Sequence, residues 1–449
     1  MAEGNSWPGR VPAQKAAGVC AAMIATIATA CGGSDASTSA ENPPLWDVPA
    51  WVNQEFGTLN DAGIKPFVTY YGVFQGNPVG GNEQSAAWSQ ELVFGATLDF
   101  EKLLHLPGAA LVISGADAAG SNLSDDIGNI FTASQAYVTP TMMFYELYWE
   151  QSLLDNALEF RVGRISSGDT FAALPAFGLQ VNGGINGNPL SVFLNSEFTA
   201  SPVATWGAYT KYAPTSDTYA SAGIYQATER LGVTAYHGMD FSIRSHDGVL
   251  LLGEVGWTPT FAQAPTPTGK VGKSSSPPAS SATSGLPGTY IAGIYYSNLP
   301  EQEFLGDGTQ QNSYGFYAMA QQMLWRNAAN PNISFSLWGG ATGNPQPEIA
   351  TMPVMGFAGA IWQGLIPGRD QDQTLFSFLI GGWSPDYADA SAAQGHGRPT
   401  TESVLEWSYI IQLTQNLTVQ PDIQYVLRPG GTGNIGDALI LGVQVGASF

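Results

Sequence analysis

The chain has 449 residues and a formal net charge of −21, from 15 basic and 36 acidic side chains. Only 11% of its residues are charged, against about 25% in a typical soluble protein, so the composition argues against an ordinary set of soluble domains. The acidic balance also excludes nucleic acid as a partner, because the chain would repel phosphates.

The remaining composition indicates the fold class. No apolar run reaches the ~20 residues that a membrane-spanning helix needs, while glycine and aromatic residues are abundant. This combination is typical of an all-β, transmembrane antiparallel β-barrel. A large secreted β-sandwich or β-helix protein is the alternative. The two cysteines, Cys20 and Cys31, lie near the start, so the body has no disulfide framework.

The first forty residues have the features of a cleaved secretory leader. A polar start precedes an apolar stretch at 16–30, which ends in small residues, as in a signal peptide. We therefore assign residues 1–40 to a leader, with a lipoprotein anchor at Cys31 as the alternative. Residues 41–62 form an N-terminal segment, in which 48–62 has the composition of a short helix.

Alternating patterns dominate residues 63–449, which we assign to the barrel. In 91–101, large apolar residues take every second position and polar residues the others, a period of two that predicts a strand. A short helix is expected at 99–105. In 403–413 the same alternation places Glu406 on the polar face. The length accommodates sixteen strands of ~10 residues with their connections.

A β-hairpin is predicted from two alternating runs at 141–153 and 158–165, separated by the short connection 154–157. In a barrel, the polar parity of each strand faces the lumen and the apolar parity faces lipid. The inward positions are Glu146, Tyr148 and Glu150 on the first strand and Glu159 and Arg161 on the second, and the outward positions of the first strand are Tyr145, Leu147 and Trp149.

Residues 262–288 are rich in proline and serine. They lack the apolar surface that would offset the entropy of ordering, so we expect a long loop within one barrel.

The C-terminal strand, residues 439–449, has one apolar face that ends at Phe449 and one small or polar face that includes Gln444. An exposed apolar strand edge invites aggregation in a soluble protein, whereas a closed barrel has no free edge. The ending resembles the signal by which the barrel-assembly machinery recognises outer-membrane barrels. We expect this strand to close the barrel and to engage that machinery.

Signals for enzymatic chemistry are weak in the sequence. The four histidines have no metal-ligand spacing, and no phosphate-binding, dinucleotide-binding or nucleophile motif stands in a strand–turn–helix context. We expect no enzyme, cofactor or metal. Glu146 and Glu150 are a carboxylate pair, but sequence spacing does not establish the separation that a glycosidase needs. Carboxylates and guanidinium groups facing one another across a pore offer acceptors and donors to a neutral polyol. The alternative is a set of inward ion pairs that only stabilises the barrel.

Six segments of the chain together resemble the OprB-type family of carbohydrate-selective outer-membrane porins. The resemblance implies a sixteen-stranded barrel in the outer membrane of a Gram-negative bacterium, which admits glucose and related sugars by facilitated diffusion through a constriction with arginines and carboxylates. By motif, it assigns Glu150, Arg161, Arg164, Glu254 and Arg369 to the lumen. The segments are 145–172, 186–209, 235–257, 313–324, 367–384 and 405–449.

The main hypothesis is therefore a passive porin for neutral sugars in contact with outer-membrane lipids. A general or cation-leaning diffusion pore is the first alternative, because of the charge of −21. A barrel enzyme acting on lipid or polysaccharide and a secreted β-rich binding protein are the others. The sequence leaves the choice between a monomer and an oligomer open.

Overall fold

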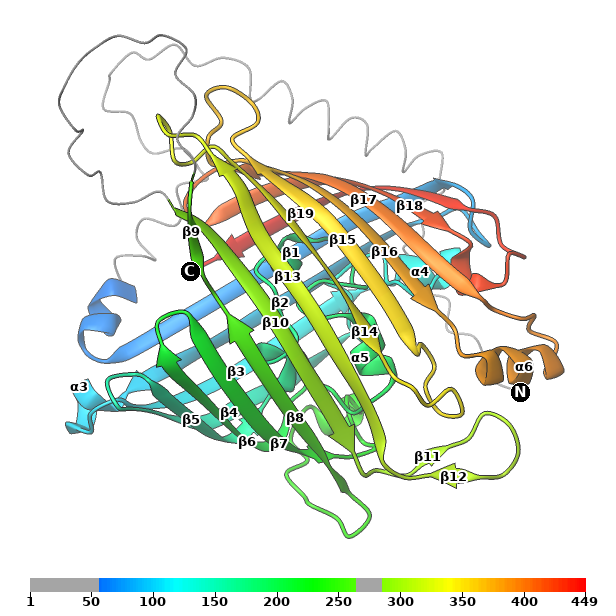
Figure 1. Cartoon of the computed structure of the whole chain (residues 1–449), viewed down its shortest axis with the longest axis horizontal. Coiled ribbons are helices and arrows are strands. Elements are labelled where there is room, and N and C mark those ends of the chain that lie inside the picture. The colour runs from blue at the N-terminus through cyan, green and yellow to red at the C-terminus, as the bar shows by residue number, and fades with distance from the viewer. Residues whose placement is uncertain (1–55, 264–284) are drawn as a thin grey trace.

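The computed structural model describes residues 56–263 and 285–449. Sixteen long antiparallel strands form one closed barrel (Figure 1). The strands are β1 (Ile64–Val79), β2 (Ala86–Asp99), β3 (Ala109–Gly120), β4 (Thr141–Leu153), β5 (Leu158–Ile165), β6 (Thr205–Thr215), β7 (Thr218–Ala227), β8 (Gly248–Trp257), β10 (Gly285–Ser297), β13 (Ser313–Arg326), β14 (Ser334–Gly343), β15 (Val354–Gln363), β16 (Gln373–Gly382), β17 (Thr401–Gln412), β18 (Leu417–Leu427) and β19 (Ala438–Ser448).

The barrel closes where the first strand pairs with the last. β1 is hydrogen-bonded to both β2 and β19, and the pairing continues past β19, because Phe449 N donates to Val68 O at 2.9 Å and Val68 N to Phe449 O at 3.1 Å. Each of the sixteen long strands in the described residues therefore pairs with a neighbour on both sides, as a wall in lipid requires. The all-β fold and the sixteen strands are therefore confirmed.

Short elements occupy the connections. Residues 56–61 are helical and fall inside the helix predicted at 48–62, whose first part lies outside the described residues. The helix expected at 99–105 is α3. No helix in the described part of the chain is long and apolar enough to cross a membrane. The short elements are α3 (Phe100–Leu104), α4 (Leu123–Ile127), α5 (Leu190–Leu194), α6 (Pro385–Ala393), β9 (Thr260–Ala262), β11 (Glu301–Gln302) and β12 (Thr309–Gln310).

Two boundaries of the predicted low-complexity loop are wrong. Its last residues, 285–288, belong to β10, and Ala262 at its start belongs to β9. The two strands pair with each other, with Gly285 opposite Ala262, and this pairing satisfies backbone groups that a loop would leave to water. The middle of that loop, like the predicted leader, lies outside the residues that the structure describes.

The hairpin of β4 and β5 has the predicted bounds, but one predicted face is wrong. Tyr145 was expected to face outward, yet it is 4% exposed and its hydroxyl donates to Asp169 at 3.1 and 3.2 Å. The cause is a β-bulge: the β3–β4 register shifts there, so that Tyr145 and Glu146 together oppose Ser114. Both residues therefore point inward, whereas strict alternation would separate them.

The two rims of the barrel differ. One rim, here called the short-turn rim, carries the tight connections 154–157, 216–217 and 413–416, and α3 also lies there. The opposite long-loop rim carries α6 and the β11–β12 hairpin (Figure 1). In outer-membrane barrels short turns face the periplasm and long loops face the exterior, which orients this barrel.

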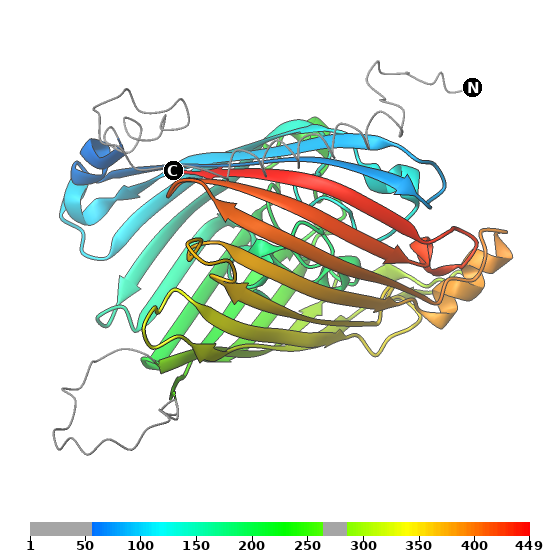
Figure 2. The ribbon, with the colours of Figure 1, turned by 90° about the horizontal axis from the view of Figure 1, so that it is seen from above.

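Two connections from the long-loop rim fold into the barrel. These inward loops, residues 121–140 and 166–204, lie between the walls in Figure 2. Many of their apolar side chains are buried, and Phe171 and Phe177 have no exposed surface. Phe177 packs against the inward-facing rings of Trp338 and Phe357 at centroid distances of 5.7 and 5.4 Å. The hydrophobic core thus lies inside the barrel, between the inward loops and its wall.

The outer wall is apolar. Outward side chains at mid-strand are large and exposed, including Val255 on β8, Ile294 on β10 and Phe376 on β16. Near the short-turn rim, Trp257 and Tyr290 lie side by side with ring centroids 5.3 Å apart. An apolar band bordered by aromatic rings is the surface that a bilayer requires of a barrel.

Candidate functional site

A charged cluster lies on the inner face of the β4–β5 hairpin. Arg161 stands directly opposite Glu150 in the strand register, and Glu159 is on the same face of β5 as Arg161. The Arg161 Nε atom is 3.0 Å from Glu150 Oε2 and 2.7 Å from Glu159 Oε1. Parity therefore correctly predicted that these three charged groups lie together. Residues two apart on one strand share a face of the sheet, and residues directly opposite each other on paired strands share that face too.

Two tyrosine rings fix the guanidinium of Arg161. Its carbon lies 5.4 Å from the ring centre of Tyr148 on β4 and 5.7 Å from that of Tyr209 on β6. A guanidinium near two π faces gains cation–π attraction and loses rotamer freedom. Tyr148 thus faces inward as predicted, whereas Tyr209 was not a predicted site residue. Its inward position could have been found only by assigning a parity to β6.

The cluster is reachable from the lumen. The side chains of Glu150, Glu159 and Arg161 keep 29%, 26% and 21% of their surface, unlike the other predicted lumen carboxylates. Lys211 on β6 extends the cluster, with its Nζ 4.4 Å from the centre of the Tyr219 ring. We call Tyr148, Glu150, Glu159, Arg161, Tyr209 and Lys211 the lumen strip.

Glu254 is an anchor for an inward loop. Its Oε2 accepts the Ala172 N–H at 2.9 Å and the Tyr317 hydroxyl at 2.8 Å, and its Oε1 accepts the Tyr219 hydroxyl at 2.8 Å. The side chain faces inward, as expected, but only 5% of the residue is exposed. Its acceptor capacity is used by the protein, so Glu254 holds residue 172 against the wall.

Glu406 and Glu146 act in the same way. Glu406 accepts the backbone N–H groups of Val181 and Asn182 at 2.7 and 3.3 Å, and it is 3% exposed. Glu146 accepts the Ser166 N–H at 3.1 Å, at the point where the chain leaves β5, and it is 6% exposed. Both face the interior as predicted, but both bind the 166–204 loop.

Glu402 is an anchor that the sequence reasoning did not single out. Its carboxylate accepts the backbone N–H groups of Ile130, Phe131 and Gly430 at 2.7 to 3.0 Å, and it has no exposed surface. It lies four residues before Glu406 on the inner face of β17. That spacing was visible in the sequence, but nothing there indicated that a loop would fold back to meet it.

Two predicted lumen residues lie elsewhere. Arg164 has the opposite parity to Arg161, and its guanidinium donates to the carbonyls of Asp240 and Ala204 at 3.1 and 2.7 Å. Arg369 lies on the connection between β15 and β16, where it pairs with Asp372 at 2.7 Å. The prediction of lumen positions for Arg164 and Arg369 was therefore wrong, because motif similarity does not specify which face a side chain takes.

Metal binding has no support in the described ranges, where no group of three or more His, Cys, Asp or Glu side chains could hold an ion. What the lumen strip offers is hydrogen bonding: a fixed guanidinium, an ammonium, two carboxylates and two phenol groups.

Comparison with known proteins identifies the family. The family model for "Carbohydrate-selective porin, OprB family" matches residues 83–449. The chain belongs to this family. Porin B of Pseudomonas aeruginosa is 23% identical over 441 residues, which cover 90% of this chain and 91% of that protein. This OprB-family chain is thus a non-enzymatic outer-membrane barrel of a Gram-negative bacterium, through which sugars diffuse.

Solved structures support the fold. The chain is similar to OprB of Pseudomonas putida at high pH, with a TM-score of 0.79 and 22% identity, covering 89% of this chain and 97% of that chain. Its similarity to the low-pH structure of the same protein has a TM-score of 0.56 and 19% identity, over 92% of this chain and 100% of that one.

Proposed function

We propose that this porin selects neutral sugars and that its lumen strip is where a sugar contacts the wall. The support is the arrangement around Arg161, which two carboxylates and two tyrosine rings hold in one orientation. A sugar hydroxyl both donates and accepts, so donors and acceptors side by side suit it better than either alone. A guanidinium fixed in advance binds without a further cost in side-chain entropy.

The charges of the lumen strip favour a neutral solute. Glu150 and Glu159 contribute −2 and Arg161 and Lys211 contribute +2, so the strip is formally neutral although the whole chain carries −21. A general or cation-leaning pore would be expected to present an excess of carboxylates to the solute. The carboxylates Glu254 and Glu406 do not supply that excess, because they are buried against the inward loop.

The rest of the chain fits an exported porin. We infer that residues 1–40 are a leader removed on export, that 41–62 precede the barrel and that 63–449 form it. The assembly machinery would bind the β19 strand, whose pairing through Phe449 completes the wall. Glucose is our candidate for the permeating sugar, and the proposal holds for a monomer or an oligomer.

Liposome swelling tests the choice of solute. Proteoliposomes would be placed in isotonic glucose, in glucosamine as the cation and in glucuronate as the anion, which are similar in size and differ in charge. We expect glucose to enter fastest. Faster entry of glucosamine would contradict the proposal and support the cation-leaning pore, and equal rates for all three would support a general pore.

A further inference from the structure

The barrel wall has a gap beside β4. The chain leaves β5 at Ile165 and enters the lumen as an inward loop, while β4 continues to Thr141. Leu147 pairs with Arg164, but Phe144 has no ladder partner on β5. In a bilayer such a gap would leave backbone groups without partners, which costs several kcal/mol for each group.

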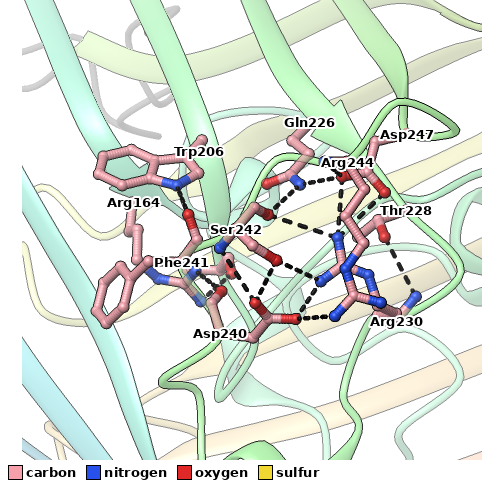
Figure 3. Close-up of polar contacts among 11 residues, drawn as sticks. Arg164, Trp206, Gln226, Thr228, Arg230, Asp240, Phe241, Ser242, Arg244 and Asp247 are labelled. Atoms are coloured by element: carbon pink, nitrogen blue, oxygen red, sulfur yellow. Dashed lines mark hydrogen bonds and ion pairs between the residues drawn. The ribbon is translucent and has the colours of Figure 1, made fainter.

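A segment from the connection between β7 and β8 fills this gap. We call residues 236–243 the wall patch. Its His237 carbonyl accepts the Phe144 N–H at 2.9 Å, as a neighbouring strand would. Its Asp240 and Phe241 carbonyls accept from Arg164 at 3.1 Å and from the Trp206 indole N–H at 2.9 Å (Figure 3). The patch therefore joins β4 to β5 and β6 from outside the ladder.

The carboxylate of the patch, Asp240, is paired within the protein. Arg230 forms ion pairs with Asp240 and with Asp247, the latter at 2.9 Å (Figure 3). The guanidinium of Arg164 is covered by the Phe241 ring, whose centre lies 5.0 Å from its carbon. Arg164 has the outward parity, which is unusual for a charged residue on a barrel. The patch explains this position, because it covers the Arg164 side chain.

Two apolar side chains of the patch are strongly exposed, and Tyr236, His237 and Ser242 are exposed beside them. Met239 and Ile243 are 58% and 71% exposed, in contrast to the paired charges of the same segment. Below the patch on β5, the outward residues Phe160 and Val162 are also exposed. The patch therefore continues the apolar outer wall toward the long-loop rim.

The height of the lower edge of the patch places that edge within the apolar band. Arg164, at its lower edge, pairs with Leu147, six positions from Leu153 at the short-turn end of β4. At about 3.3 Å per residue and a tilt near 40°, this is roughly 15 Å up a wall whose apolar band is about 25 Å tall.

We propose that residues 236–243 are a lipid-facing part of the barrel wall, in which Met239 and Ile243 contact the acyl chains of outer-leaflet lipids. The continuity with the apolar belt supports lipid as the occupant. A second copy of the chain covering the patch is an outcome that the test below distinguishes from lipid. This inference is independent of the sugar-binding proposal.

Site-directed spin labelling tests the proposal in the full-length chain. The only cysteines, Cys20 and Cys31, would be changed to serine, and nitroxide labels would be placed at Met239→Cys and Ile243→Cys in proteoliposomes. Collisions with oxygen, which concentrates in the bilayer, would be compared with collisions with a water-soluble nickel chelate. Two positions are used, so that a local disturbance by one label does not decide the result.

Two labelled controls define the scale. Ile294→Cys lies on the outward face of β10, and Asp307→Cys lies on an exposed loop of the long-loop rim. We expect the ratio of oxygen to nickel collisions at both patch labels to match that of Ile294→Cys. This ratio should be at least severalfold higher than the ratio at Asp307→Cys. Labels that resemble Asp307→Cys would overturn the proposal, and so would labels shielded from both reagents, since a second protein would then cover the patch.

Discussion

At the residue scale, function depends on which carboxylates remain accessible. Parity along β4 and β5 predicted Glu150, Glu159 and Arg161 as one group, and their contacts are as expected. The accessible and anchoring carboxylates have the same sequence pattern, an acid on the inner face of a strand. Glu254 differs because distant groups donate to it, among them the N–H of Ala172, 82 positions away. Local pattern carries no information about such a contact, so the sequence overestimated the number of solute-facing acids.

Replacing Glu150 with glutamine should change ion preference without unfolding the barrel. The change removes one negative charge from a neutral strip, and a partly exposed ion pair adds little stability. We expect the reversal potential in a salt gradient, measured in a planar bilayer, to shift toward anion preference. Glu348→Gln, which removes a carboxylate on an exposed loop, is the matched control. A shift of equal size in the control would mean that the overall charge of the protein, and not the lumen strip, sets the ion preference.

At the element scale, the inward loops are held by the wall and the wall is completed by a loop. The strand pattern predicted β4 and β5 with their observed bounds, because each has a clear period of two. It did not predict the bulge at Tyr145 and Glu146, since an extra residue leaves no mark in the pattern. The wall patch could not be predicted from the sequence either, because its hydrogen bonds to Phe144 and Trp206 are accepted by backbone carbonyls.

Glu254→Gln should loosen the 166–204 loop. The amide loses the charge that strengthens three hydrogen bonds and brings an N–H₂ group among donors, so unfolding should become easier by about 1–3 kcal/mol. Chemical denaturation in detergent, followed by the heat-modifiable gel shift, measures the change. Glu150→Gln, with a partly exposed side chain, should change the same free energy by less than about 1 kcal/mol. Equal stability of wild type and Glu254→Gln would show that the anchor is unimportant.

At the scale of the whole molecule, closure of the ladder was the most predictable property. The low charge, the absence of a spanning apolar run and the alternating C-terminal strand together predicted a closed barrel, and the β1–β19 pairing confirms it. The interior was not predictable in the same way. It is filled by two long connections, and their packing against Trp338 and Phe357 depends on tertiary contacts.

The barrel should fold without residues 264–284. Ala262 and Gly285, which flank this segment, stand opposite each other in the β9–β10 pair, so a short turn can replace it at little cost in loop entropy. We expect normal heat-modifiable migration and unchanged conductance after replacement by a short glycine-containing turn. Loss of assembled protein would mean that the segment contributes to the barrel. Deleting 121–140 instead should impair folding, since this loop carries the fully buried Phe131.

The most direct measurement of the central claim is single-channel recording with glucose titrated into the bath. We predict that glucose reduces the ion current of the wild-type channel and that Arg161→Ala raises the half-blocking concentration about tenfold, which corresponds to about 1.4 kcal/mol. The control Arg369→Ala removes an arginine from the connection between β15 and β16. It should retain the wild-type half-blocking concentration. An unchanged block in Arg161→Ala, or an equal loss in both variants, would contradict a sugar contact at the lumen strip.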